Sequence, residues 1–535
     1  MKAVKLNHIE LFAGCGGLSL GLESVGFELL LANELSPMAA ETFAYNFFNE
    51  DLTALAEQHK FPTHTLWLNS QHKDLKPRLR ENPFDFPAFE QKAFSDIPNE
   101  PASLKGKLVV GSIVELNKLL DTYPEYAEQL KTAFGKTGGL DLVSGGPPCQ
   151  SFSMAGKREK DNDKNSLPWA FANFVKHTQP KVALLENVTG ILRAFKDDEG
   201  NSFHAWYEVA KVFASIGYYP LCLHVNARLT GVAQNRPRFI LLALRADHFE
   251  QVAKRFNKTE TELFYQSITF YDLVQKHGAK LQFGSLEYFD TSRAKDFSYF
   301  QNSFLKPLIS HEEVSVRSAI DDLREDSLEP SDFVKELSEQ FNPLLKNHNF
   351  KHTPNHELRN NSPIVQRRFR LYQVLQQIGE RQITKSVFAV LKSEAEKLDE
   401  NAWLALKNYK YLQEKGQLIH FGKKEEFEKY LATHPTKKQT QKALAANSPA
   451  PAALSIPDDA CHYDENELRV LTVREMARIQ SFPDNFVFRS KITTGGQMRK
   501  FEVPQYTQVG NAVPPLLGKA LGIVLSNFLQ NQNSH

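Results

Sequence analysis

The stretch Asp141-Leu-Val-Ser-Gly-Gly-Pro-Pro-Cys-Gln-Ser-Phe-Ser153 runs from a short apolar segment into a turn that carries a cysteine. Its first residues are apolar and include a β-branched side chain, which is typical of a buried strand. Gly145 and Gly146 free the backbone, and the two prolines that follow cannot donate ladder hydrogen bonds, so the strand must end there. Cys149 is therefore expected on a rigid turn at the carboxyl end of a strand, where open α/β sheets bind ligands. A cysteine that only fills a core would not need this turn, and we predict a nucleophile.

Two acidic residues follow other predicted strands. Glu34 comes directly after the strand 27–32 and lies 20 residues beyond Gly14, a spacing at which an acid can bind ribose hydroxyls. Glu186 follows four apolar residues, where a carboxylate is costly to bury unless it is used; it could also simply cap the next helix. Glu34, Cys149 and Glu186 all fall at the carboxyl ends of strands predicted to be parallel. The sequence therefore predicts one site at one rim of an α/β sheet.

A glycine loop, residues 13–17, lies between the first predicted strand and a helix. Such a loop lets a ligand approach the backbone near the start of the helix. A dinucleotide-binding fingerprint that begins at Gly14 would require a third glycine at position 19, and the chain has Ser19 there. This difference argues against NAD as the ligand.

A third polar group follows the predicted strand 220–225. Gln234, Arg236 and Arg238 alternate along the chain, so their side chains point to one side if the segment is extended. Together they could bind a base edge or a phosphate. An ordinary polar surface stripe would show the same pattern.

The chain has 535 residues, of which 41% are hydrophobic and 24% charged, as in ordinary globular proteins. No apolar run approaches the roughly 18 residues that span a bilayer, and the first residues lack the apolar core of a signal peptide. The 4 cysteines are widely scattered, which predicts neither disulfides nor a metal cluster. We therefore expect a cytoplasmic protein that has no membrane partner and no metal.

The regularity of the pattern divides the chain into three parts. Residues 1–245 alternate predicted strands and helices, apart from an insertion at 50–107 that proline interrupts repeatedly. Residues 246–469 break this rhythm, although 364–378 and 403–412 are expected to be helices. Residues 346–442 hold 19 lysines and arginines against 10 acidic residues, while the whole chain has a net charge of +1. This excess suits a polyanion partner, although a solvated helical face is equally compatible. Residues 470–535 are expected to return to the sheet, with a capping box at Thr472 and a long terminal helix.

Six motifs together resemble the cytosine-C5 DNA methyltransferase family. In chain order they are Glu10-Leu-Phe-Ala-Gly-Cys-Gly-Gly17, Gly146-Pro-Pro-Cys-Gln150, Glu186-Asn-Val188, Gln234-Asn-Arg-Pro-Arg238, Arg474-Glu-Met-Ala-Arg-Ile-Gln-Ser-Phe-Pro483 and Gln508-Val-Gly-Asn-Ala-Val513. The resemblance implies a Rossmann-like S-adenosylmethionine-dependent core in residues 1–245 and a separate, mostly irregular target-recognition region in 246–469. Residues 470–535 would then return to the core.

The resemblance also implies a chemistry and a set of site residues. Cys149 would add to a flipped cytosine, Glu186 would bind or protonate N3, and Arg238 is the candidate to stabilise the thiolate, with Arg236 and Gln234 beside it. The methyl donor implied is S-adenosylmethionine. Its expected contacts are Phe12, Gly14, Gly16, Glu34, Ser112, Pro148, Leu167 and Asn511. Ser112 stands where the family usually has an aspartate, which puts the affinity for the adenine in question.

The expected partner is double-stranded DNA, bound by a monomer. A cognate restriction endonuclease acting on the same site is the expected second partner, if the chain is the protecting half of a restriction-modification pair. Two alternatives remain open at this point: methylation of cytosine in tRNA by the same chemistry, and a catalytically silent DNA-binding homologue.

Overall fold

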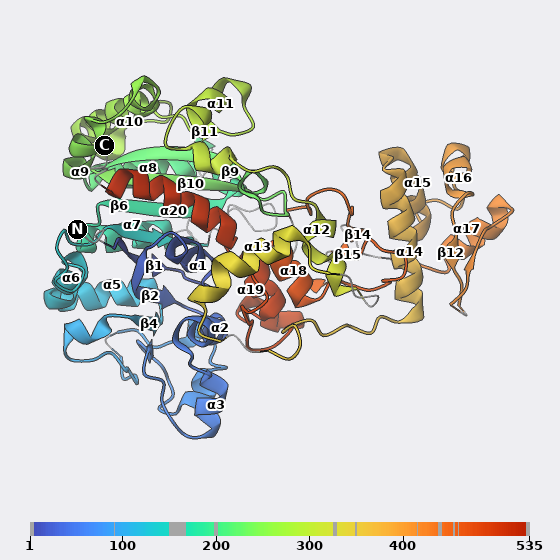
Figure 1. The fold of residues 1–535 in the computed structure, drawn as a ribbon, viewed down its shortest axis with the longest axis horizontal. Coiled ribbons are helices and arrows are strands. Elements are labelled where there is room, and N and C mark those ends of the chain that lie inside the picture. Colours follow the sequence, from blue (N-terminus) through green and yellow to red (C-terminus); the bar gives the residue numbers. More distant parts are fainter. Residues whose placement is uncertain are drawn as a thin grey trace.

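A computed structural model describes residues 5–89, 91–148, 167–196, 202–324, 329–347, 350–414, 416–436, 441–452, 455–457 and 460–530. Cys149 lies outside them. The main feature is a nine-stranded sheet in the order β11-β9-β10-β6-β5-β1-β2-β4-β3 (Figure 1). Its strands are β1 Asn7–Leu11, β2 Glu28–Glu34, β3 Thr65–Trp67, β4 Lys107–Val110, β5 Leu142–Gly145, β6 Val182–Val188, β9 Tyr218–Asn226, β10 Pro237–Arg245 and β11 Phe289–Asp290.

The six neighbouring strands β6, β5, β1, β2, β4 and β3 are parallel to one another. Strand β10 is antiparallel to both of its neighbours, β6 and β9. The carboxyl ends of β2, β5 and β6 therefore share one rim, as the sequence predicted. Since β9 is antiparallel to β10, it runs in the same direction as β6, and β11 runs parallel to β9. The ends of β9 and β11 thus lie at this same rim.

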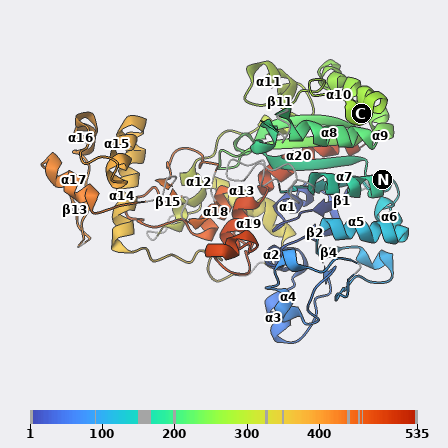
Figure 2. The ribbon, with the colours of Figure 1, turned by 180° about the vertical axis from the view of Figure 1, so that it is seen from behind.

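Helices cover both faces of the sheet, each over its own apolar core. The face toward the reader in Figure 1 carries α1 and α20, and the opposite face, seen in Figure 2, carries α5, α7 and α8. The helices of this layered body are α1 Gly17–Glu23, α2 Pro37–Phe48, α5 Ile113–Thr122, α6 Pro124–Lys131, α7 Leu167–Thr178, α8 Ala205–Ser215 and α20 Pro515–Leu529. This confirms the predicted α/β class.

The terminal helix α20 packs very closely on α1. A Cβ atom built on Gly21 would lie 2.4 Å from the carbonyl oxygen of Pro515 and 2.5 Å from the amide nitrogen of Lys519. Only glycine allows two helix backbones to approach so closely at this point. The terminal helix therefore packs on the first helix of the sheet body, and α18 Val473–Ile479 begins with the predicted capping box of Thr472 and Glu475.

The segment that follows residue 245 also packs on the sheet. Helices α9 Ala246–Ala253 and α10 Lys258–His277 lie near β9, and α10 contacts α8 as well. Strand β11 then extends the sheet and is followed by α11 Ala294–Gln301. The sequence assigned these residues to the target-recognition region. The domain boundaries stay predictions. A boundary at residue 245 would separate α9, α10 and β11 from the sheet that they contact.

Residues 363–432, which we call the helical lobe, form a separate apolar core away from the sheet (Figure 1, right). Helix α14 Pro363–Ile378 confirms the predicted helix 364–378. The predicted helix 403–412 is wrong in part, because α16 spans Glu400–Leu406 and β12 Tyr411–Leu412 pairs with β13 Leu418–Ile419. The lobe is completed by α15 Arg381–Leu391 and α17 Lys424–Ala432. It is more helical than the sequence predicted.

Shorter elements connect these parts. The insertion contributes α3 Leu52–Glu57, α4 Leu75–Arg78 and the edge strand β3. Between the sheet and the lobe lie α12 Val316–Ile320, α13 Asp332–Phe341 and α19 Gln505–Asn511, together with the pair β14 Lys442–Ala443 and β15 Ala460–Cys461. A small ribbon, β7 Phe195–Lys196 and β8 Ser202–Phe203, follows β6. Among the described residues, no single helix could cross a membrane by length and composition, whereas one bent pair, 496–511 with 515–529, could.

Candidate active site

An ion pair stands at the carboxyl end of β6. Glu186 Oε1 lies 2.7 Å from Arg238 Nε, and each side chain is only 11% exposed. The antiparallel register of β6 and β10 places the two residues on the same face, since Glu186 is opposite Ile240 and Arg238 is opposite Val188. Two buried, paired charges have little freedom to move. The geometry therefore fixes one carboxylate oxygen of Glu186 and leaves the other, Oε2, for further contacts.

The chain that leads to the cysteine begins directly beside this pair. A Cβ atom on Gly146 would lie 2.9 Å from Glu186 Oε2, so any side chain at this position would crowd that oxygen. Asn187 Nδ2 donates a hydrogen bond of 2.9 Å to the carbonyl oxygen of Pro147. Pro148 is exposed at the edge of the described residues. The structure thus brings Glu186, Arg238 and the start of the cysteine loop together.

Arg236 and Gln234 share the buried side of their segment with Arg238, as the alternation predicted. The hydrogen bonds of their side chains, however, go to backbone carbonyl groups. Arg236 Nη2 donates to the carbonyl oxygens of Gly510 at 2.8 Å and Ala512 at 2.9 Å, and Gln234 Nε2 donates to Pro451 O at 3.0 Å. Burial, together with the nearby Arg238, lowers the pKa of Arg236. A direct part in catalysis stays a prediction for both residues.

The two carbonyl groups held by Arg236 flank Asn511, an expected cofactor contact that is exposed. The same C-terminal segment also touches the glycine loop: a Cβ atom on Gly17 would lie 2.2 Å from the carbonyl oxygen of Val513. The structure therefore brings Asn511 to the loop that contains Gly14, although 497 residues separate the two in the chain.

Glu34 ends β2 and faces the glycine loop. Its Oε2 accepts the Gly14 amide hydrogen at 2.7 Å and its Oε1 accepts that of Ser36 at 2.8 Å. Burial raises the pKa of Glu34, and the hydrogen bonds from Ser36 and Gly14 oppose this. A carboxylate has about four lone-pair sites, so unused ones remain for ribose hydroxyls. Gly14 has a φ of 56° and no atom within 4 Å of the position of a Cβ, which leaves space for a ligand. These features fit a nucleoside.

The remaining expected contacts are placed around this end of the sheet. Phe12 follows β1 with a φ of 54°. Ser112 is the N-cap of α5, and its Oγ accepts the amide hydrogen of Val114 at 3.2 Å, which leaves the hydroxyl hydrogen free to donate. Gly16 has a φ of 98° and a Cβ there would lie 2.3 Å from the Phe47 ring, so packing already requires glycine. Leu167 is half-buried at the start of α7.

One buried pair below the glycine loop was missed from the sequence. The hydroxyl of Ser19 in α1 donates to the carboxylate of Glu10 in β1, and both residues are buried. Burial raises the pKa of Glu10 to about 8. The sequence contained a signal, because Glu10 is an acid within an apolar strand and Ser19 stands where a dinucleotide-binding fingerprint would have a glycine. Only the fold shows that the two side chains meet.

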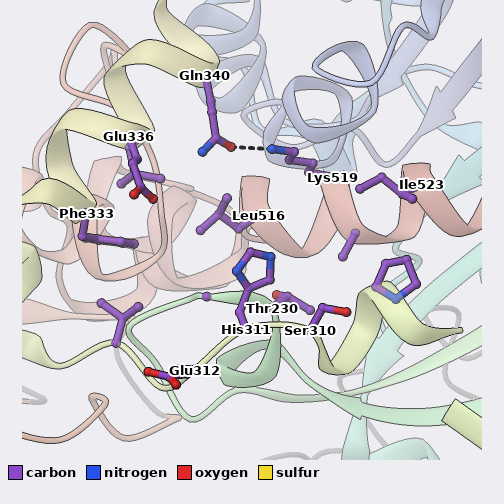
Figure 3. Close-up of a pocket in the computed structure, with 15 residues that line it drawn as sticks. Thr230, Ser310, His311, Glu312, Phe333, Glu336, Gln340, Leu516, Lys519 and Ile523 are labelled. Atoms are coloured by element: carbon purple, nitrogen blue, oxygen red, sulfur yellow. Dashed lines mark hydrogen bonds between the residues drawn. The ribbon is translucent and has the colours of Figure 1, made fainter. Parts of the chain in front are cut away.

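A crevice of about 410 Å³ lies elsewhere, between α13 and α20 (Figure 3). Leu516, Lys519 and Ile523 of α20 face Phe333 and Gln340 of α13 across it, and Lys519 Nζ donates to Gln340 Oε1 at 2.7 Å. None of the predicted site residues line this crevice. The predicted site residues Glu34, Glu186 and Arg238 lie instead at the rim of the sheet.

Comparison with known proteins identifies the family. The model of the family described as C-5 cytosine-specific DNA methylase matches residues 6–68 and 127–527. Type II methyltransferase M.DdeI of Desulfomicrobium norvegicum is 24% identical over 99% of this chain and 90% of its own length. Type II methyltransferase M.Bpa9945I of Bacillus paralicheniformis is 26% identical over 98% and 99%. A solved structure of a prophage-encoded DNA modification methyltransferase of E. coli covers 98% of the chain, at 20% identity and a TM-score of 0.44.

The family model covers most of the chain and includes the paired Glu186 and Arg238. The parallel strands β4-β2-β1-β5-β6 follow the 3-2-1-4-5 order of a Rossmann-like core, and the antiparallel β10 is inserted beside β6. The chain belongs to the C-5 cytosine-specific DNA methylase family and is a DNA (cytosine-5-)-methyltransferase.

Proposed function

We propose that this chain transfers a methyl group from S-adenosylmethionine to C5 of a flipped cytosine in a specific duplex DNA sequence, through a covalent bond between Cys149 Sγ and C6. The observation that carries the proposal is the buried pair of Glu186 and Arg238 against Gly146, where the cysteine loop begins.

The chemistry requires a nucleophile because C5 of cytosine is too electron-poor to take a methyl group unaided. Addition of the Cys149 thiolate to C6 turns the ring into an enamine and makes C5 nucleophilic, which divides one difficult step into easier ones. S-adenosylmethionine, when bound, supplies the methyl group. A base then removes the C5 proton, and elimination breaks the Sγ–C6 bond and frees Cys149. A free thiol has a pKa of about 8.5, so a nearby cation favours the thiolate.

Glu186 is suited to act on N3 of the same ring. Arg238 holds Oε1, so Oε2 is the oxygen that faces the start of the cysteine loop. Binding or protonating N3 withdraws charge from the ring while the Sγ–C6 bond forms. Arg238 then has two roles in our proposal: it orients the carboxylate, and its positive charge stabilises the Cys149 thiolate.

The cofactor would bind between the glycine loop and the C-terminal segment. Glu34 would take the ribose hydroxyls, Ser112 would donate to the adenine, and the backbone at Gly14 would leave space for the rest. Phe12, Pro148, Leu167 and Asn511 would line the remaining surface. Arg236 would act by holding the two carbonyl groups that flank Asn511.

Duplex DNA would lie over the rim, because C5 and C6 are stacked inside the helix and the base must leave it, at a cost of a few kcal/mol. Residues beyond the sheet, above all the basic helical lobe, would supply groove contacts and the choice of site. The names of the relatives, Type II methyltransferases, support a restriction-modification role with a cognate endonuclease. We expect a monomer that acts in the cytoplasm.

The decisive test offers the enzyme a duplex that contains 5-fluorocytosine at its recognition site, together with S-adenosylmethionine. Because fluorine cannot leave as a proton does, the Cys149 adduct should persist in denaturing gels, and Cys149→Ser should form none. Genomic bisulfite sequencing of a host that expresses the chain supplies the site beforehand. Methyl incorporation into tRNA alone would end the DNA proposal, and incorporation into neither nucleic acid would favour the silent homologue.

A further inference from the structure

A chain of three hydrogen-bonded side chains joins the end of β6 to strand β11. Thr189 Oγ1, in the short 3-10 helix Thr189–Leu192, lies 3.1 Å from His224 Nε2 of β9. His224 Nδ1 lies 2.9 Å from Asp290 Oδ2 of β11. The order hydroxyl, imidazole, carboxylate therefore spans three elements that are far apart in the sequence.

The protons in this chain can be placed from chemistry. Burial opposes ionisation of Asp290, but hydrogen bonds from Ser292 and His224 hold the pKa of Asp290 below its ordinary value. Its Oδ1 accepts the Ser292 amide at 2.8 Å and the Ser292 hydroxyl at 2.6 Å. An ionised carboxylate only accepts, so the hydrogen of His224 is on Nδ1. In the neutral ring Nε2 is then an acceptor, and the Thr189 hydroxyl must donate to it.

The chain lies beside the catalytic pair. Thr189 directly follows Val188, whose partner in the β6–β10 register is Arg238. Two residues before Val188 is Glu186, and between them Asn187 binds Pro147 of the cysteine loop. A hydrogen bond that holds Thr189 in place therefore also restrains the end of β6. This end carries Glu186 and, through Asn187, holds the start of the cysteine loop.

We propose that Asp290, acting through His224 and Thr189, is a positioning residue for methyl transfer. The proposal rests on the proposed role of Glu186. It also gives the segment after residue 245 a part in catalysis that is distinct from DNA recognition. Reacting groups displaced by about 1 Å can lose about 100-fold in rate, so a partial release of the β6 end is expected to slow the reaction about tenfold.

The competing explanation is that these contacts only attach β11 to the sheet. Other contacts already do this without the imidazole: the Thr291 amide donates to His224 O at 3.0 Å, and Phe289 pairs with Leu223 in the parallel register of β11 and β9. The two explanations differ at Thr189, which belongs to neither β9 nor β11. A purely structural role of the contacts predicts little effect of a change there.

Thr189→Val keeps the shape of the side chain and removes the hydroxyl, and Thr189→Ser keeps the hydroxyl. We expect Thr189→Val and Asp290→Ala each to lower kcat about tenfold, with KM for DNA and for S-adenosylmethionine within about twofold of the wild type. Thr189→Ser should retain most of kcat. The double variant should be no slower than the slower single variant, because both break one chain. Asp272→Asn on the exposed face of α10 is the matched control.

The rate of adduct formation with the fluorinated duplex separates failure of this proposal from failure of the proposed function. A wild type that forms the adduct while Thr189→Val forms it equally fast overturns the positioning role alone. Equal losses in Thr189→Val and Thr189→Ser, or losses that follow a lower Tm, also overturn it. A wild type that forms no adduct overturns the proposed function, and the positioning role with it.

Discussion

The sheet body and the helical lobe use their charged side chains in different ways. In the body, Glu186 and Arg238 are each 11% exposed and hold one another in place. In the lobe, Arg367 and Arg370 are also buried, but their partners Glu414 and Glu465 are 81% and 55% exposed. A buried pair has one geometry, whereas an ion pair with a solvent-exposed partner is screened and contributes little. At the rim of the sheet both charges of the pair are therefore held in place, whereas each of these lobe pairs leaves its carboxylate in solvent.

If this comparison holds, the largest effect of a conservative change should fall on the rim of the sheet. Glu186→Gln keeps the shape of the side chain and removes its charge, so it cannot protonate N3. We expect kcat to fall by about 10²- to 10⁴-fold, the range for a lost general acid, and Tm to fall as well, because the buried Arg238 loses its counter-charge. Single-turnover methyl incorporation measures the effect. Glu208→Gln, a surface residue of α8 paired with Lys211, is the control and should stay at the wild-type rate.

A second substitution in the body should act through binding and stability together. Arg236→Met removes the donor to Gly510 and Ala512 and leaves buried carbonyl groups unpaired, which costs about 3 kcal/mol of unfolding free energy. Because these carbonyl groups flank Asn511, KM for S-adenosylmethionine should rise more than KM for DNA. Denaturant unfolding and steady-state kinetics test this. The exposed Arg255→Met should change neither quantity, and an unchanged cofactor KM in Arg236→Met would remove Asn511 from the site.

The lobe should respond differently, through the salt dependence of DNA binding. Arg381 and Lys385 on α15 and Lys392 directly after it are exposed and, by their spacing, face one side. If they contact phosphates, replacing all three with glutamine should weaken DNA binding and reduce the slope of log K against log salt by about 0.9 for each residue. At saturating DNA, kcat should be unchanged. The control replaces Lys254, Lys258 and Lys276, near or on α10, and should leave the slope as it is. A slope that does not change in the α15 variant would move the DNA contact elsewhere.

The same contrast explains what could be predicted from sequence. The rim was predictable because strand ends, glycines and prolines dictate local backbone, and parallel strands bring Glu34 and Glu186 to one edge. The contacts of Arg236 with Gly510 and of Ser19 with Glu10 were not, since both depend on packing between segments. In the lobe, the sequence pattern correctly predicted the helix 364–378. It also predicted a helix over the whole of 403–412, whereas Tyr411 lies in a strand that pairs across a hairpin. There the apolar core of the lobe outweighed local preference.

The smallest effect we expect comes from Glu10 and appears only as a function of pH. Its pKa is raised to about 8 by burial, against about 4.5 when exposed. Between these values the folded chain binds a proton that the unfolded chain has released, so the free energy of unfolding falls as pH rises through this window. Glu10→Gln keeps an acceptor for Ser19 and cannot ionise. Its Tm should therefore fall less than that of the wild type between about pH 5 and 8, and the two should converge in slope above pH 8. Parallel Tm curves across the whole range would mean that Glu10 is ionised in the folded protein, and that the buried layer beneath the glycine loop carries a charge.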